Sequence, residues 1–167
     1  IQTPDLLILP GTKNTIDDLK WLRRTGLESP ILNCARKGIP VLGICGGYQM
    51  LGNEIDDSCG AETGEVVPGL GLLPVKTVFS LEKHRTRVKG RICAQSGIWG
   101  SFSGCECTGY EIHMGESRIC EENAQGFIQL TNQSDLSTRA DGCVRENVAG
   151  TYLHGIFDEV GFCGRLI

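Results

Sequence analysis

A short apolar segment that ends in a cysteine flanked by glycines constrains the fold more than any other feature of the sequence. Residues 39–44 have the length and apolar character of a strand buried on both faces of a parallel sheet, and Cys45 follows directly, with a helix expected after it. Gly43 and Gly47 are small enough to let strand and helix pack closely, and the turn holds Cys45 in a strained conformation. The segment predicts a nucleophile elbow at the carboxyl edge of the sheet, where the helix amino terminus favours the thiolate.

The preceding residues repeat the alternation of strand and helix. Residues 5–10 form another continuous apolar run, ended by Pro-Gly. Residues 15–24 carry apolar side chains at helical spacing, with Asn14 or Thr15 as the N-cap and Gly26 as the stop, and residues 31–37 form a second helical stretch. This order of strand, helix and strand predicts an α/β fold with a parallel core.

The rest of the chain shows strands, loops and one final helix. We expect strands at residues 73–79, 86–93, 109–114, 127–130 and 148–153. Residues 53–71 and 96–104 are rich in glycine and polar side chains and are expected to be loops. The last strand leads into His154, which places an imidazole where it could face the same sheet edge as Cys45.

Cysteine and histidine together suffice for nucleophilic attack, although each residue alone has a plain structural explanation. Cys45 could be a buried structural thiol beside a glycine turn, and a lone histidine is more often packed or solvated than catalytic. His84 lies among charged residues and is most simply a solvated loop residue, whereas His113 lies in an expected strand.

Composition excludes several classes of protein. The chain has 167 residues, 16 basic and 20 acidic, for a net charge of -4, and it contains no block of Lys and Arg that would attract nucleic acid. Its apolar runs are shorter than a membrane span, and its start lacks the pattern of a signal peptide, so a cytoplasmic protein is expected. The nine cysteines are odd in number and scattered, which favours reduced thiols. Cys105 and Cys107 lie close together, but without a Cys-x-x-Cys unit no metal site is predicted.

Four separated motifs resemble one known family. Gly-Ile-Cys-Gly-Gly-Tyr-Gln at residues 43–49 resembles the nucleophile motif of class I glutamine amidotransferases. The motifs LPGTKNT (9–15), GYEIHMG (109–115) and GTYLHGIF (150–157) narrow the resemblance to the cobyric acid synthase family. The resemblance covers nearly the whole chain and implies a flavodoxin-like three-layer α/β fold with a mostly parallel central sheet, incomplete at its amino terminus.

The resemblance also implies a role for individual residues. Cys45 would attack the side-chain amide of glutamine, and His154 would activate the thiol and protonate the leaving ammonia. The backbone N–H groups of Gly11 and Gly46 match the oxyanion hole, and Gln49 matches a position that helps to hold glutamine.

This chain departs from the broader class after the histidine. Many class I glutaminases carry a glutamate two residues beyond it, where this chain has Ile156. A Cys-His dyad is therefore expected, with Glu111 as a candidate to orient His154.

The resemblance further implies that residues 1–167 form a glutaminase domain fragment of a longer enzyme. The family has an N-terminal ATP-dependent synthetase domain, which would bind ATP and Mg²⁺ and amidate a corrinoid at four carboxylates of the a,c-diamide. No phosphate-binding loop motif occurs in this chain, so no cofactor is expected in it. Its expected partners are glutamine, its own synthetase domain and, in the full enzyme, the corrinoid, with no nucleic acid and no membrane.

Three other interpretations remain. The related cobyrinic acid a,c-diamide synthases share the cysteine and histidine motifs, but tend to have GHEFHYS where this chain has GYEIHMG. An elbow cysteine and a histidine would also suit another cysteine hydrolase on the same fold. A non-catalytic remnant is the third alternative, and the presence of both Cys45 and His154 counts against it.

Overall fold

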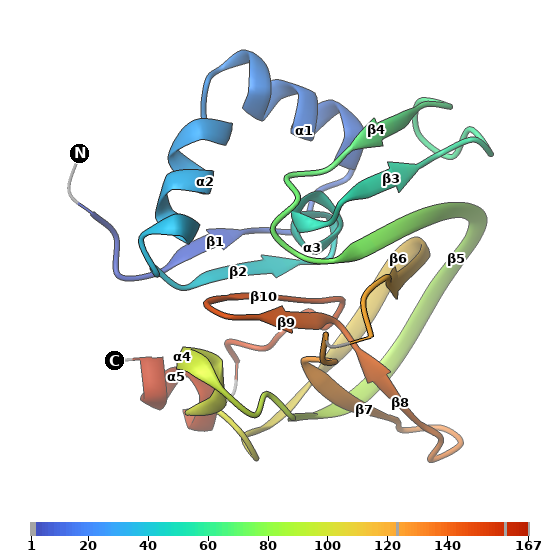
Figure 1. The fold of residues 1–167 in the computed structure, drawn as a ribbon. Coiled ribbons are helices and arrows are strands. Elements are labelled where there is room, and N and C mark those ends of the chain that lie inside the picture. The colour runs from blue at the N-terminus through green and yellow to red at the C-terminus, as the bar shows by residue number, and fades with distance from the viewer. Residues whose placement is uncertain (1–2, 123, 159, 167) are drawn as a thin grey trace.

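A parallel sheet forms the centre of the computed structural model, which describes residues 3–122, 124–158 and 160–166. Sheet A has the strand order β1-β2-β10-β9 (Figure 1). Its strands are β1 (Leu7–Leu9), β2 (Val41–Ile44), β9 (Cys143–Arg145) and β10 (Val148–Thr151). The strands β1, β2 and β10 run parallel, and β9 pairs antiparallel with β10. The predicted α/β fold with a parallel core is confirmed.

The helices of the first half follow the predicted order. They are α1 (Thr15–Arg24), α2 (Glu28–Arg36) and α3 (Gly46–Leu51), the last starting directly after Cys45. Asn14 occupies the N-cap position of α1, as expected, but its side chain makes no capping hydrogen bond. The carboxylate of Glu62 accepts the N–H of Ile16 at 3.0 Å instead, so a distant loop supplies the negative charge that a helix amino terminus favours. None of the described helices is long and apolar enough to cross a membrane.

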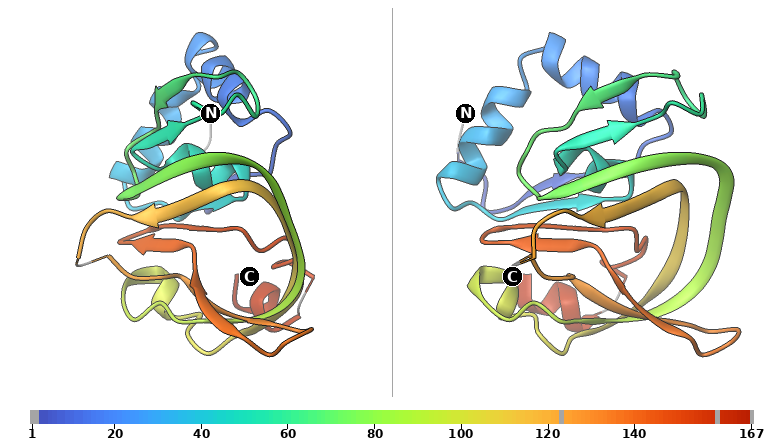
Figure 2. Two further views of the ribbon diagram at one scale, coloured as in Figure 1. Left: turned by 90° about the vertical axis from the view of Figure 1, so that its right-hand side faces the viewer. Right: turned by 45° about the vertical axis from the view of Figure 1, so that its right-hand side comes forward.

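Sheet B is strongly curved, with its long strand β5 bending around one side of the molecule (Figure 2). It has the order β4-β3-β5-β7-β8, with β6 paired to β5. Its strands are β3 (Glu54–Asp56), β4 (Val66–Pro68), β5 (Val75–Ile92), β6 (Glu106–Ile119), β7 (Ile128–Asn132) and β8 (Thr138–Asp141). Most of its pairings are antiparallel. The core lies between the sheets and helices and contains Tyr48, Trp99, Phe127 and Phe162.

Several expected boundaries were wrong. The separate strands predicted at residues 73–79 and 86–93 are one strand, because the residues between them contain no glycine or proline and continue the ladder with β6 through a bulge after Val78. The loop predicted at residues 53–71 contains β3 and β4, and the one at 96–104 contains α4 (Gly97–Gly100). Strands of three or four residues are too short to show a periodic pattern, which also explains why β8 and β9 were missed. The expected final helix is α5 (Val160–Leu166).

The loop between β3 and β4 is held by one carboxylate. Asp57 is completely buried and accepts the backbone N–H groups of residues 61–64 at 2.7–2.9 Å. Burial alone would raise the pKa of Asp57, but these four donors stabilise the charged form and lower it to about 2. The same loop places Glu62 at the start of α1. Its polar side chains therefore hold the loop in one conformation and bind it to the helix.

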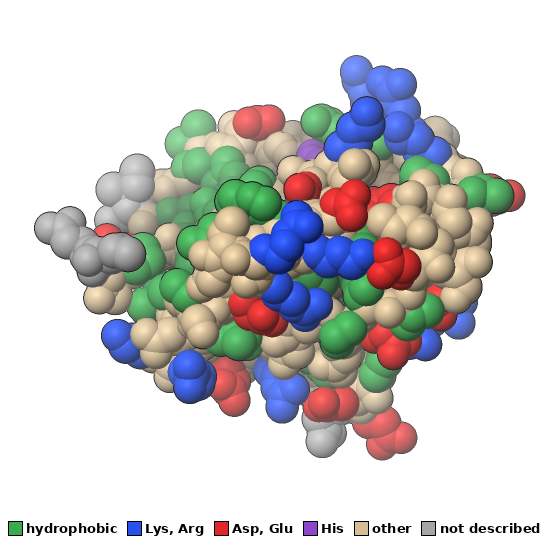
Figure 3. Space-filling model, turned by 90° about the horizontal axis from the view of Figure 1, so that it is seen from above, with side chains coloured by type: hydrophobic (Ala, Val, Ile, Leu, Met, Phe, Trp, Pro, Cys, Tyr) green, Lys and Arg blue, Asp and Glu red, His purple; other side chains and the backbone are tan. Residues whose placement is uncertain are grey.

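Acidic and basic side chains adjoin one another on the face above α1 and β4 (Figure 3). Lys20 pairs with Glu65 at 2.5 Å, and Arg23 pairs with Glu28 at 3.3 Å. These pairs are partly exposed, so each contributes little to stability. They link α1 to the residue before β4 and to α2.

The close packing of β1, β2 and α3 depends on glycine. A methyl group on Gly47 would collide with the carbonyl oxygen of Leu9, and one on Gly43 would lie 2.6 Å from a methyl carbon of Leu51. We therefore expect Gly47→Ala to lower the free energy of unfolding by about 3 kcal/mol or more, because the strand and the helix must separate.

Gly164→Ala is the matched control, since a methyl group there meets no described atom within 4 Å. Its position in α5 predicts a gain of about 0.5–1 kcal/mol from the lower backbone entropy of alanine. Denaturant unfolding of the full-length protein measures both changes. Equal effects of the two substitutions would contradict this account of Gly47.

Candidate active site

The pairing of β2 with β10 places Cys45 at the carboxyl edge of sheet A. Ile44 is in register with Thr151, and the N–H of Cys45 donates to the Thr151 carbonyl at 2.8 Å. Cys45 has φ 52° and ψ −111°, a backbone conformation that residues other than glycine rarely adopt. The predicted nucleophile elbow is therefore present, and the strain is stored at the cysteine itself.

Gly11 lies between Cys45 and His154. A methyl group on Gly11 would be 3.0 Å from Cε1 of His154 and 3.5 Å from Cβ of Cys45. Both side chains therefore border the same small space, although they are separated by more than one hundred positions in the sequence. The structure brings together three of the predicted site residues at this point.

Gly46 follows Cys45 as the first residue of α3. Its backbone N–H lowers the pKa of the Cys45 thiol, and a methyl group on it would collide with the side chain of Thr12. A donor in this position could serve an oxyanion formed next to the sulfur.

Strand β6 holds His154 in place. Tyr110 and His154 exchange two backbone hydrogen bonds, of 2.9 and 3.2 Å, and their rings stack with centroids 5.1 Å apart and planes inclined by 5°. A methyl group on Gly109 would collide with the carbonyl oxygen of His154, which explains a glycine at this position. Nε2 of His154 is buried and has no hydrogen-bond partner among the described residues. Tyr110 was not singled out from the sequence, although it lies within the GYEIHMG motif.

Burial dominates the electrostatics of the thiol. Cys45 is 7% exposed, and burial raises its pKa to about 11, although the Gly46 N–H acts in the opposite direction. The negative charges of Asp141 and Glu62 add to the rise. The expectation that the helix amino terminus favours the thiolate is not met at rest, because α3 is only six residues long and desolvation of the anion costs more. The resting sulfur is therefore protonated and donates to the carbonyl of Ile112 at 3.4 Å.

Burial has the opposite effect on the imidazole. It lowers the pKa of His154, and the negative charge of Glu111 partly offsets this change. His154 is consequently neutral near pH 7, which is the form that can accept a proton from the thiol.

Glu111 faces other partners. One carboxylate oxygen pairs with Arg139, and the other, which is buried without a hydrogen-bond partner among the described residues, lies 3.9 Å from Nε2 of His113. The structure thus places Glu111 in an ion pair with Arg139, and its effect on His154 is one of charge. An orienting role for Glu111 stays a prediction.

Gln49 is buried behind the cysteine, in a network of hydrogen bonds. Its carbonyl oxygen accepts from Thr15 at 3.1 Å, and its amide group donates to the hydroxyl of Tyr152 at 3.1 Å and the carbonyl of Met114 at 3.3 Å. It therefore ties α3 to α1, β6 and the segment before His154. Direct binding of a substrate by Gln49 stays a prediction.

A cavity of about 640 Å³ is lined mainly by residues of sheet B. Its lining includes Tyr48, Glu111, His113, Asp141 and Tyr152, but neither Cys45 nor His154 is among the described residues that line it. The pair of Cys45 and His154 and this cavity are therefore separate features, although Tyr48 of α3 and Tyr152, which is bonded to Gln49, border the cavity.

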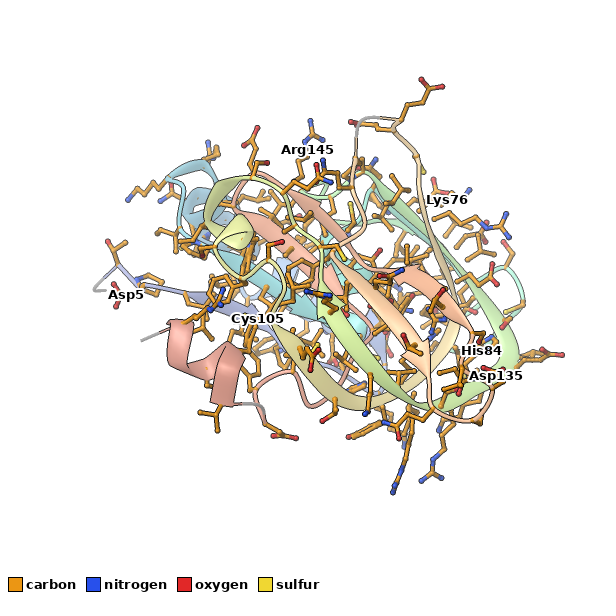
Figure 4. The ribbon with its side chains drawn as sticks, turned by 90° about the horizontal axis from the view of Figure 1, so that it is seen from below. Asp5, Lys76, His84, Cys105, Asp135 and Arg145 are labelled. Atoms are coloured by element: carbon orange, nitrogen blue, oxygen red, sulfur yellow. The ribbon has the colours of Figure 1, made fainter. Side chains whose placement is uncertain are left out.

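Cys105, one of the two cysteines considered for zinc, lies far from His84 (Figure 4). Cys105 is on the side of α5, where its sulfur is 3.9 Å from the carbonyl of Gly161, whereas His84 is at the opposite end of sheet B (Figure 4). In the part of the chain that the structure describes, no three His, Cys, Asp or Glu side chains come together as metal ligands do.

The raised pKa of Cys45 predicts how its reactivity depends on pH. With iodoacetamide and no substrate, the rate of Cys45 alkylation should rise about tenfold per pH unit from pH 7 to 9, because the thiolate fraction of a thiol with a pKa of about 11 still grows throughout this range. Mass spectrometry of the Cys45 peptide measures the rate, with the exposed Cys120 in the same sample as a reference. A plateau near neutral pH would instead indicate a resting thiolate paired with protonated His154.

Comparisons with known proteins identify relatives of this chain. Cobyric acid synthase of Ruminiclostridium cellulolyticum is 49% identical over 158 residues, which are 93% of this chain and 30% of that protein. Cobyric acid synthase of Lachnoclostridium phytofermentans is 46% identical over 98% of this chain and 33% of its own length. The chain thus spans about a third of the length of these relatives.

Solved structures share the fold at low sequence identity. One is described as the structure of PurLQS from Thermotoga maritima, with a TM-score of 0.61 and 19% identity over 97% of this chain and 76% of the other. Another is a glutamine amidotransferase, with a TM-score of 0.58 and 17% identity over 96% of this chain and 76% of the other. Residues 1–162 match the family described as the CobB/CobQ-like glutamine amidotransferase domain, and the chain belongs to that family.

Proposed function

We propose that this chain hydrolyses glutamine to glutamate and ammonia through a dyad of Cys45 and His154. His154 takes the thiol proton while the sulfur attacks the side-chain amide carbon, and the same proton then leaves with ammonia. Water, deprotonated by His154, attacks the resulting glutamyl thioester and releases glutamate and the thiol. The observation that carries the proposal is the small space at Gly11 bordered by both side chains.

The backbone N–H groups of Gly11 and Gly46 are proposed to bind the oxyanion of each tetrahedral intermediate. Both glycines adjoin Cys45, and the Gly46 N–H acts in favour of its thiolate. Fixed donors at this position stabilise charge that develops only in the transition state.

Two further side chains support the dyad in this proposal. Gln49 holds the glutamine substrate, which requires that part of its network with Thr15 and Tyr152 open when substrate enters. The charge of Glu111 keeps His154 more basic than burial alone would, while the carboxylate itself stays paired with Arg139.

In the full-length protein, the ammonia is proposed to serve the ATP-dependent amidation of adenosylcobyrinic acid a,c-diamide at carboxylates b, d, e and g. Residues 1–167 would form the glutaminase domain, and an N-terminal synthetase domain would bind ATP, Mg²⁺ and the corrinoid. The proposal is supported by the relatives named cobyric acid synthase, of which this chain matches about a third. The same relatives favour this assignment over cobyrinic acid a,c-diamide synthase.

The roles of Cys45 and His154 can be tested in the full-length protein supplied with glutamine, ATP and the corrinoid. Cys45→Ala and His154→Ala should each lower glutamate release by about 10³-fold or more, because each removes a group that reacts directly. Added ammonium should still support corrinoid amidation by Cys45→Ala. Glutamate release and amide formation are measured in parallel.

Cys120→Ala and His84→Ala are matched controls, since both residues are exposed in the structure. They should leave glutamate release unchanged. Glutamine hydrolysis by Cys45→Ala would overturn the dyad, and a wild-type protein that hydrolyses another amide or ester but not glutamine would favour a different cysteine hydrolase.

A further inference from the structure

Thr151 accepts backbone hydrogen bonds from Cys45 and from the residue before His154. Its carbonyl oxygen accepts the N–H of Cys45 at 2.8 Å, and its hydroxyl oxygen accepts the N–H of Leu153, the residue before His154, at 3.0 Å. Thr151 is completely buried. The backbone carbonyl of Thr151 therefore holds the backbone at Cys45, and its hydroxyl group holds the backbone next to His154.

Asp141 determines the orientation of Thr151. The hydroxyl group of Thr151 has a single proton, and because the hydroxyl oxygen already accepts from Leu153, that proton is free to be donated to the Asp141 carboxylate. The same carboxylate oxygen accepts the N–H of Tyr152 at 3.1 Å. Two consecutive residues before His154 are thus bonded to one buried carboxylate.

The carboxylate comes from a different sheet. Asp141 is the last residue of β8 in sheet B and is 5% exposed, whereas Thr151 is the last residue of β10 in sheet A. Its backbone is anchored by Phe127, whose N–H donates to the Asp141 carbonyl at 3.0 Å. The bond to Thr151 therefore joins the two sheets at the point where the chain turns towards His154.

We infer that Asp141 is a positioning residue for glutamine hydrolysis, acting through the hydroxyl of Thr151 on the geometry of Cys45 and His154. This inference rests on the proposed function. Asp141 touches neither reactive atom; it fixes the rotamer of Thr151, which holds the elbow on one side and the His154 segment on the other. A displacement of about 1 Å between reacting groups can lower a rate by about 10²-fold.

Kinetics of the full-length protein test this role. Thr151→Val keeps the shape of the side chain but removes its hydroxyl, and Asp141→Ala removes the acceptor. Each should lower kcat for glutamate release by about 10–100-fold while KM changes by less than about threefold, because the geometry of the reacting groups is altered more than substrate binding. Alkylation of Cys45 by iodoacetamide should also change in rate in both variants.

Two conservative variants and a double mutant make the test specific. Thr151→Ser and Asp141→Asn keep a hydroxyl and an acceptor oxygen, so both should retain kcat within about threefold of wild type. The double variant Asp141→Ala/Thr151→Val should lose much less kcat than the product of the two single effects, since both substitutions break the bond between Asp141 and Thr151, although each also removes one backbone bond of its own.

Asn147→Ala is the matched control at the other end of β10. Its amide group donates to the carbonyls of Ala35 and Ile39, at 3.0 and 2.6 Å, so the substitution also removes partly buried hydrogen bonds. It should lower stability without lowering kcat. The inference would be overturned if Asn147→Ala lost as much kcat as Asp141→Ala and Thr151→Val. It would also be overturned if the effects of Asp141→Ala and Thr151→Val multiplied in full in the double variant, or if neither single variant changed kcat.

The failure of the proposed function would give a different result. If the wild-type protein releases no glutamate, the proposed function is wrong whatever the variants do. The Cys45 alkylation rate would then still decide whether Asp141 and Thr151 control the cysteine, because that readout needs no substrate.

Discussion

The site depends on the parallel pairing of β2 with β10, completed by the hydrogen bond from the Cys45 N–H to the Thr151 carbonyl. The two strands end at the same edge of sheet A, so residues more than one hundred positions apart leave the sheet together. Because Cys45 has a positive φ, its side chain leaves the strand direction at once and borders the space at Gly11 that His154 also borders. Slippage by one residue would turn every side chain of the strand to the other face and separate the pair.

Burial gives the pair its resting chemistry. It raises the pKa of the thiol to about 11 and lowers that of the imidazole, so both groups are neutral near pH 7. A neutral imidazole beside a neutral thiol can move one proton when the sulfur attacks, and no charge needs to be buried before substrate arrives. The amino end of a six-residue helix does not overcome this desolvation, although the Gly46 N–H acts in favour of the anion.

The curved sheet B contributes to the site as much as the parallel sheet does. Neighbouring side chains of β6 have different surroundings: Tyr110 stacks on His154, whereas Glu111 pairs with Arg139 and lines the cavity. Alternation of side chains along a strand produces this division. The backbone carbonyl of Ile112 also accepts from Cys45. Asp141 connects sheet B to Thr151, whose own hydrogen bonds hold the backbone near Cys45 and His154.

The sequence alone determined the α/β class and the elbow at Cys45, because a buried strand, a glycine turn and a helix are local patterns that neighbouring residues specify. It also predicted a role for His154. It divided β5 into two separate strands. It also did not show β3, β4, β8 and β9, because strands this short are defined by the strands with which they pair. Only the tertiary structure decided that Glu111 pairs with Arg139, that Gln49 is bonded within the protein, and that Asp141 reaches Thr151. Those contacts join segments distant in the chain, and their energies depend on burial, which no local pattern records.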